Sequence, residues 1–151
     1  MAAKPSERIV VRSKAVQILK KLDVFTGLAE DEYFKVLGMC SSTEARQGET
    51  LFKQGDDGAS MFILLTGEIQ INVEGVGPVH TMKAGEILGE IGLVCDIKRT
   101  ASAVATQDSV LLQLFGRIFH DVVRKYPHVG YVIMHNIAGI LAHRLTAKNS
   151  N

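Results

Sequence analysis

Glycine is concentrated in the middle of this 151-residue chain, and its spacing constrains the fold more than any other feature. Nine of the 14 glycines lie within 45 residues, at Gly48, Gly55, Gly58, Gly67, Gly75, Gly77, Gly85, Gly89 and Gly92. Short apolar runs lie between and after them, at 50–53, 61–66, 68–73, 79–82, 101–105 and 110–115. Frequent turn residues between short apolar runs are typical of an antiparallel roll or barrel. We therefore expect a jelly-roll-like β-roll of about eight strands over residues 43–115.

One of these runs carries a clear strand pattern. Ile69, Ile71 and Val73 alternate with the polar Gln70 and Asn72. Since successive side chains of a strand point to opposite faces, this alternation predicts a half-buried strand with its apolar face inward.

A helical pattern precedes the roll, over residues 1–42. Ser13 can cap the start of a helix that carries Val16 and Leu19 on one side. A second, shorter helix is expected over residues 30–38. These segments predict N-terminal helices that flank the roll.

Two more helices are expected after the roll, over residues 116–147. The first covers 117–125, and Pro127 suits the first turn of the second, where a missing N–H costs nothing. Apolar residues recur every fourth position in that second helix, at Val129, Ile133, Ile137, Leu141 and Leu145. Such a stripe must be covered. We therefore predict a single α+β domain over residues 1–151, with a C-terminal helical lid.

Two glycines interrupt the last helix, Gly130 and Gly139. Each costs about 1 kcal/mol relative to alanine in a helix. Close packing of the helix against the roll is the simpler explanation, and we favour it. The alternative is a helix kept marginally stable so that it can open and close.

Composition and charge exclude several classes of partner. The net charge is only +1, so the chain as a whole has no electrostatic basis for binding nucleic acid. Cys40 and Cys95 lack the spacing of metal ligands and favour a reduced, cytoplasmic setting. No apolar run is long enough for a signal peptide or for a membrane span. We expect a cytoplasmic protein without a nucleic-acid or membrane partner.

Common enzyme motifs are missing from the sequence, including the phosphate-binding loop G-x-x-x-x-G-K-S/T, H-E-x-x-H, G-x-S-x-G and C-x-x-C. Of the five histidines, only His80 lies in the predicted roll. A metal-binding cupin, the competing class of β-roll enzyme, needs several histidines there. We therefore expect no catalytic activity from this chain alone, no metal and no cofactor.

Residues 85–105, GEILGEIGLVCDIKRTASAVA, carry the residue types that a ligand made of phosphate and sugar requires. Arg99 can bind a phosphate with its planar fork, and Thr100 can add a hydroxyl. Gly92 allows the backbone to approach the ligand, and the N–H groups of a short helical turn can point at the same anion. Glu90 repels phosphate, so its role is to accept a hydrogen bond from the ribose 2′-hydroxyl.

Each of these residues also has a simpler structural explanation. Glu90 and Arg99 could form an ion pair with each other, Gly89 could be an ordinary turn residue, and Thr100 could be the start of a strand. Taken singly, these explanations are simpler. Taken together with Gly85 and the apolar strand that follows, the joint pattern favours a ligand site.

The stretch Leu88, Gly89, Glu90, Ile91, Gly92, Leu93, followed by Arg99, Thr100 and Ala101, resembles the phosphate-binding cassette of the cyclic-nucleotide-binding domain family. That family includes protein kinase A regulatory subunits, cyclic-nucleotide-gated channels and the catabolite activator protein. Segments 24–28, 47–56 and 61–68 are similar to its helical entry and early strands, in the same order, so the resemblance covers most of the chain.

This resemblance implies a set of ligand contacts. Glu90 would take the ribose hydroxyl and Arg99 the phosphate, and Thr100 with the backbone of the cassette would complete the phosphate shell. The residues assigned to this shell are Gly89, Glu90, Ile91, Gly92, Leu93, Arg99, Thr100 and Ala101. The purine would contact Met82 and His80, which share a face of the preceding strand, although His80 could equally be a surface residue. Candidates to cap the purine from the last helix are Ile140, His143 and Arg144.

The chain departs from the family pattern at three places. Lys98 stands where many members have proline, which should loosen the loop. Leu88 replaces a common phenylalanine. Ala59 and Ser60 replace a frequent aspartate, which is expected to affect a turn rather than the site. None of these changes removes a ligand contact, so we expect binding.

The function implied is a regulatory domain that binds cAMP or cGMP and controls an attached or partner effector through its last helix. We favour cAMP, with cGMP as the competitor. A threonine after the arginine is compatible with a guanine amino group and often accompanies cGMP binding in the family, but channel members with the same Arg-Thr-Ala also bind cAMP. The alternative is a degenerate member of the family that serves as a ligand-independent interaction or dimerisation module. A homodimer or an effector domain is the expected partner.

Overall fold

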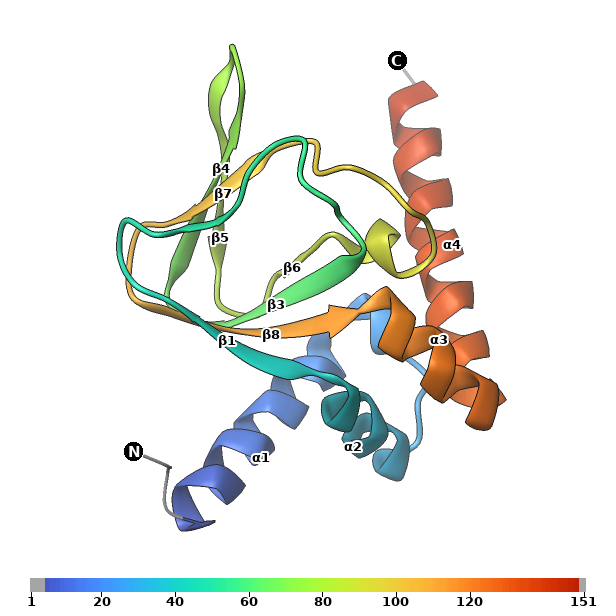
Figure 1. Ribbon diagram of the computed structural model, residues 1–151. Helices are drawn as coiled ribbons and strands as arrows, with labels where there is room; N and C mark the ends of the chain where they lie inside the picture. Colours follow the sequence, from blue (N-terminus) through green and yellow to red (C-terminus); the bar gives the residue numbers. More distant parts are fainter. Residues whose placement is uncertain (1–4, 150–151) are drawn as a thin grey trace. The chain divides into compact units, whose positions relative to one another are not determined.

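The computed structural model describes residues 5–149 (Figure 1). Its contacts divide the chain into two compact units. The roll unit is Met39–Phe119, and the helical unit is formed by residues 5–38 and 120–149.

The roll unit consists of two antiparallel sheets of four strands each, which can be followed in Figure 1. The strand order is β1-β8-β3-β6 in one sheet and β2-β7-β4-β5 in the other. The strands are β1 (Ser41–Ala45), β2 (Thr50–Phe52), β3 (Ser60–Thr66), β4 (Glu68–Val73), β5 (Gly77–Lys83), β6 (Ile87–Leu88), β7 (Ser102–Ala105) and β8 (Ser109–Phe115). The eight strands confirm the predicted β-roll.

The core of the roll lies where the inner faces of the two sheets meet. It is built from Ala45, Phe62, Leu64, Ile69, Ile71, Met82, Ala103, Ala105 and Leu111. Ile69 and Ile71 are buried while Gln70 and Asn72 are only half-buried, which confirms the alternation predicted for this strand. Each buried isoleucine lies opposite an alanine of β7, so that large and small side chains face each other across the pair.

Two strands are not indicated by an apolar run in the sequence, one because it is polar and one because it is too short. The strand β1 reads SSTEA, and it is held by its pairing with β8, in which Thr43 lies opposite Leu111. The strand β6 has only two residues, opposite Phe62 and Ile63 of β3. Both form because a long, apolar neighbour supplies the partner, so the local sequence carries little information about them.

The helices are α1 (Pro5–Lys21), α2 (Glu30–Met39), α3 (Gly116–Lys125) and α4 (Pro127–Asn149), with a short 3-10 helix η1 (Asp23–Phe25). The predicted second, third and fourth helices are confirmed. The predicted start of the first helix at Ser13 is wrong, because α1 already begins at Pro5. Proline suits the first helical turn, and a serine inside a helix costs only a few tenths of a kcal/mol.

Within the helical unit, polar contacts fasten α4 to the N-terminal segment. His128 Nδ1 lies 2.7 Å from a carboxylate oxygen of Glu32, whose other oxygen accepts the N–H of Ala29 at 2.8 Å. The Ala29 N–H, followed by His128, holds the pKa of Glu32 below its usual value. Asn136 donates to the carbonyls of Val24 and Thr26 at 3.1 and 2.8 Å. The two ends of the sequence therefore form one unit.

The apolar stripe of α4 is covered only in its first half. Val129, Ile133 and Ile137 are buried, Leu141 is half-buried and Leu145 is 62% exposed. The helix is 23 residues long. No helix within residues 5–149 combines the length and the apolarity needed to cross a membrane.

The two glycines of α4 differ in their surroundings. A Cβ at Gly130 would lie 2.7 Å from Cβ of Val123 on α3, whereas a Cβ at Gly139 would meet nothing within 4 Å. Gly130 is thus explained by close packing, but against α3 rather than against the roll as predicted. Packing does not explain Gly139.

We predict opposite effects of alanine at these two positions. Gly139→Ala should raise the free energy of unfolding by about 1 kcal/mol, because alanine is the better helix former and has room. Gly130→Ala should lower it by about 1–3 kcal/mol, because the new methyl group overlaps Val123. Denaturant titration of both variants measures this difference, and equal effects would contradict the packing described for Gly130.

Candidate functional site

The predicted cassette forms a tight turn at the end of β6. Gly89 follows β6 with φ 83° and ψ 32°, a left-handed conformation that favours glycine, and the 3-10 helix η2 (Glu90–Leu93) begins directly after it. A Cβ at Gly89 would lie 2.6 Å from Nη1 of Arg99. Gly89 therefore brings the backbone of the cassette against the guanidinium of Arg99, as the prediction of a shared site requires.

Gly92 has a packing role that the sequence did not predict, and its predicted contact with a ligand stays a prediction. Its N–H donates to the carbonyl of Gly89 at 2.9 Å. A Cβ at Gly92 would overlap the carbonyl oxygen of Gly58 and lie 3.0 Å from that of Ser60. The close approach that requires a glycine is thus made to the start of β3.

Arg99 lies in a cradle of aromatic rings. The side chain is buried, with 8% of the residue exposed. Its guanidinium carbon is 4.4 Å from the ring centre of Phe52 and 5.5 Å from that of Phe62. The two rings stack with their centres 5.8 Å apart. Nη2 donates to Oγ of Ser60 at 2.9 Å. Cation–π attraction and one neutral acceptor therefore hold the group in place.

No carboxylate neutralises Arg99 at close range. The salt bridges formed by residues 5–149 do not include one at Arg99. The Nε atom of Arg99 is buried and has no hydrogen-bond acceptor among the described residues. Burial lowers the pKa of Arg99 from its usual value, and the more distant Asp56 carboxylate partly opposes this. Since arginine keeps its proton in proteins, a positive charge is buried here without a salt bridge to a carboxylate of the described residues. Such a charge is costly, and an anion beside it would be strongly stabilised.

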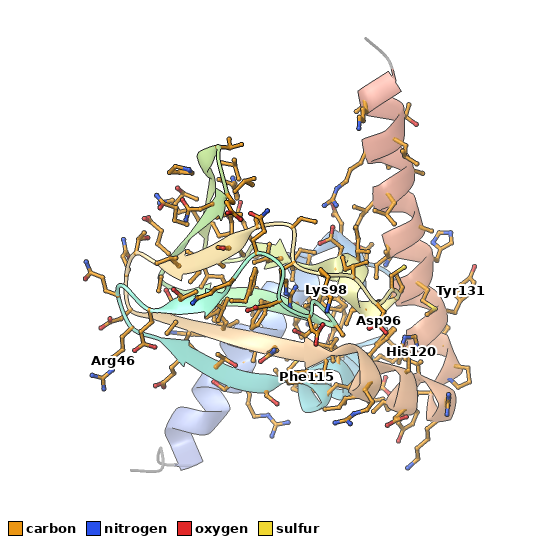
Figure 2. The ribbon with its side chains drawn as sticks, turned by 45° about the horizontal axis from the view of Figure 1, so that its top comes forward. Arg46, Asp96, Lys98, Phe115, His120 and Tyr131 are labelled. Atoms are coloured by element: carbon orange, nitrogen blue, oxygen red, sulfur yellow. The ribbon has the colours of Figure 1, made fainter. Side chains whose placement is uncertain are left out.

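The loop that leads into Arg99 is tied to residues 55–58, and the labelled Asp96 and Lys98 locate it in Figure 2. Three backbone hydrogen bonds join the two segments, from Gly55 to Arg99, from Arg99 to Asp56 and from Gly58 to Ile97, at 2.7–2.8 Å. Lys98 also forms a salt bridge with Asp57. Both side chains of this salt bridge are exposed, so it stabilises the loop little, and the expectation that Lys98 loosens the loop stays a prediction.

Glu90 is buried, with 4% of the residue exposed, in the first turn of η2. The ion pairs within the described part of the chain do not include one between Glu90 and Arg99. No salt bridge among these supports the simpler explanation of Glu90 and Arg99 as a structural pair.

The other cassette residues differ in exposure. Leu93 is fully buried and Ile91 half-buried. Thr100 is exposed at the surface, and Ala101 packs against the core of the roll. The structure thus brings together Gly89, Arg99 and the η2 turn, and it leaves the Thr100 side chain open to solvent.

The two predicted purine contacts share a face of β5 by register, since Met82 lies opposite Ile69 and His80 opposite Ile71. Only Met82 is buried, in the core of the roll. His80 is an exposed residue whose Nε2 lies 3.3 Å from a carboxylate oxygen of Glu86.

Ile140, His143 and Arg144 lie on α4 in the helical unit. Ile140 is half-buried, whereas His143 and Arg144 are exposed. Their assignment as caps of the purine stays a prediction.

Three residues at the site escaped the sequence analysis: Phe52, Phe62 and Ser60. The replacement at Ala59 and Ser60 was expected to affect only a turn, which is wrong, because Ser60 begins β3 and its hydroxyl contacts Arg99. A polar residue at the start of the apolar run SMFILL was the available signal. Nothing in the sequence indicated that Phe52 and Phe62 would enclose a cation.

The site contains no cluster suited to a metal. Within residues 5–149, no three His, Cys, Asp or Glu side chains gather as metal ligands would. The arrangement of a buried cation, a buried carboxylate and a glycine turn is suited to binding an anionic, hydroxylated ligand.

Comparison with protein families matches residues 42–126 to the cyclic nucleotide-binding domain. The match covers more than half of the chain. The chain therefore belongs to the cyclic nucleotide-binding domain family, as its cassette residues suggested.

Relatives with known names fall into several kinds of protein. The chain is 32% identical over 131 residues to the cyclic AMP receptor protein of Thermus thermophilus. This alignment covers 84% of this chain and 59% of the relative. It is 30% identical over 122 residues to the human cyclic nucleotide-gated channel beta-3, covering 78% of this chain and 15% of the channel. The chain thus spans less than two thirds of the length of these relatives.

Solved structures share the fold. The N-terminal domain of a transcriptional regulator from Streptomyces coelicolor A3(2) superposes with a TM-score of 0.81 at 20% identity, covering 89% of this chain and 96% of that domain. The catabolite activator protein of Thermus thermophilus gives a TM-score of 0.73 at 30% identity, covering 85% of this chain and 60% of that protein. The β-roll with its helices is therefore the fold of this family.

We predict that Gly92→Ala disrupts the cassette. The new methyl group would overlap backbone atoms of Gly58 and Ser60, which cannot move as a flexible side chain can, so η2 must shift. The free energy of unfolding should fall by about 1–3 kcal/mol in denaturant titration. Gly38→Ala is the control, because a Cβ there meets nothing within 4 Å. Equal stability of the two variants would contradict the packing described for Gly92.

Proposed function

We propose that this chain binds a cyclic nucleotide in its β-roll and acts as a regulatory sensor. The observation that carries the proposal is the guanidinium of Arg99, buried against Phe52 and Phe62 without a carboxylate partner in the described residues. A cyclic phosphate carries one negative charge, which matches one buried positive charge. Hydrogen bonds between charged groups of this kind contribute roughly 1.5–3 kcal/mol each.

In this proposal each part of the ligand has its own partner. Arg99 binds the phosphate, with Thr100 and the backbone of the Gly89–Ile91 turn beside it. Glu90 accepts a hydrogen bond from the ribose 2′-hydroxyl, a neutral group that brings no second charge next to the buried carboxylate. The purine contacts Met82 and His80.

We favour cAMP over cGMP. The relative from Thermus thermophilus that aligns over most of this chain is named a cyclic AMP receptor protein. Thr100, whose type is compatible with a guanine amino group, keeps cGMP as the competing ligand.

Ligand binding would be coupled to movement of α4, with Ile140, His143 and Arg144 as the candidates that cap the purine. A ligand can change the conformation of the domain only if it binds one of two conformations more tightly than the other, and this difference in affinity would drive the regulation of an effector. The output would be an attached or partner effector, or a second copy of this chain, in the cytoplasm. The proposal includes no catalytic step.

Thermal unfolding with each nucleotide tests the proposal. At about 100 times its dissociation constant, a ligand that binds only the folded state adds roughly 2.7 kcal/mol of stability. We expect a rise in the melting temperature with cAMP and a smaller rise with cGMP at equal concentration. If neither nucleotide raises the melting temperature, the family member is degenerate and serves as a ligand-independent interaction module.

A matched pair of variants assigns the effect to Arg99. Arg99→Met should abolish the shift with cAMP while the unliganded protein stays folded, because an apolar chain of similar length can fill the aromatic cradle. Lys98→Met removes the neighbouring, exposed cation and should leave the shift intact. Loss of the shift in both variants would contradict a specific role for Arg99.

A further inference from the structure

The hydroxyl of Ser60 lies between two donors from different segments of the roll. Arg99 Nη2 donates to it at 2.9 Å, and Gln113 Nε2 donates to it at 3.1 Å. Ser60 is 4% exposed, at the start of β3, and Gln113 lies on the neighbouring strand β8. Both contacts use Ser60 as an acceptor, so the serine orients the guanidinium without giving it a counter-charge.

Gln113 is itself held from a third strand. Thr43 of β1 donates its hydroxyl to Gln113 Oε1 at 3.4 Å, a long contact. The three strands are neighbours in one sheet, in the order β1-β8-β3. The acceptor of Arg99 therefore lies on a paired strand of the sheet, whereas Arg99 itself lies on the loop before β7.

We propose that Ser60, fixed by Gln113, is a positioning residue that holds the Arg99 guanidinium ready for the phosphate. The proposal rests on the proposed function and deepens it. A neutral hydroxyl fixes the orientation and leaves the full charge available to the ligand. Preorganisation of this kind raises affinity because less freedom is lost on binding.

Calorimetric titration with cAMP tests the proposal through a double-mutant cycle. Ser60→Ala should weaken cAMP binding about tenfold, because the guanidinium loses its fixed orientation. In the background of Arg99→Lys, whose ammonium group has no planar fork to orient, the same change should weaken binding less than twofold. This loss of additivity is expected when one residue acts through the other. Additive effects, or unchanged affinity in Ser60→Ala, would overturn the positioning role.

Ser109→Ala is the matched control. Ser109 is another buried serine of the roll, 3% exposed, and its hydroxyl accepts the N–H of Glu68 at 3.1 Å and donates to the carbonyl of Gln107 at 2.8 Å. Its loss should lower the melting temperature of the protein and leave the affinity for cAMP unchanged. If Ser109→Ala weakens cAMP binding as much as Ser60→Ala does, a general loss of stability explains both, and the proposal fails.

A second readout needs no ligand. In nitrogen-15 NMR spectra of the unliganded protein, the Nη groups of Arg99 should give separate resonances, because the hydrogen bond to Ser60 hinders rotation of the guanidinium. In Ser60→Ala these resonances should merge. Identical spectra for the two proteins would overturn the proposal. If the wild-type protein binds neither cAMP nor cGMP, the proposed function fails, whereas the NMR comparison still decides whether Ser60 positions Arg99.

Discussion

A positive charge buried among aromatic rings is the interaction on which the rest of this site depends. Arg99 lies over Phe52 and Phe62. Its guanidinium donates a hydrogen bond to the neutral hydroxyl of Ser60 and forms no salt bridge with a carboxylate of the described residues. Burying an ion without a counter-charge costs several kcal/mol, which the roll must offset elsewhere. The packed core of two sheets and the backbone ties between the cassette loop and residues 55–58 supply that stability. In the proposed function, a ligand with one negative charge would offset part of this cost.

The sequence predicts much of this fold, because the deciding signals are local. Glycines at turns and short apolar runs indicate the roll, the alternation around Ile69 and Ile71 indicates a half-buried strand, and Pro127 marks the start of α4. The strand β1 was missed because SSTEA has no apolar face and depends on pairing with β8. The sequence predicts too late a start of α1, because Ser13 has the side chain of a helix cap although the helix already begins at Pro5.

The candidate site was predictable only in part, since its geometry depends on residues far apart in the sequence. The cassette motif indicates Gly89, Glu90 and Arg99. The partner of Arg99, Ser60, stands 39 positions away, and its role is apparent only when β3 brings it to the cassette. The packing role of Gly92 could not be predicted from the cassette either, because the atoms that leave no room for a side chain belong to Gly58 and Ser60.

A crystal structure of the chain with cAMP tests the central claim most directly, through the distance from the exocyclic phosphate oxygens to the guanidinium of Arg99. If the buried charge is the phosphate site, one oxygen lies about 3 Å from Nε or Nη1, and the contact of Nη2 with Ser60 is kept. A nucleotide bound with its phosphate away from Arg99 would contradict the account.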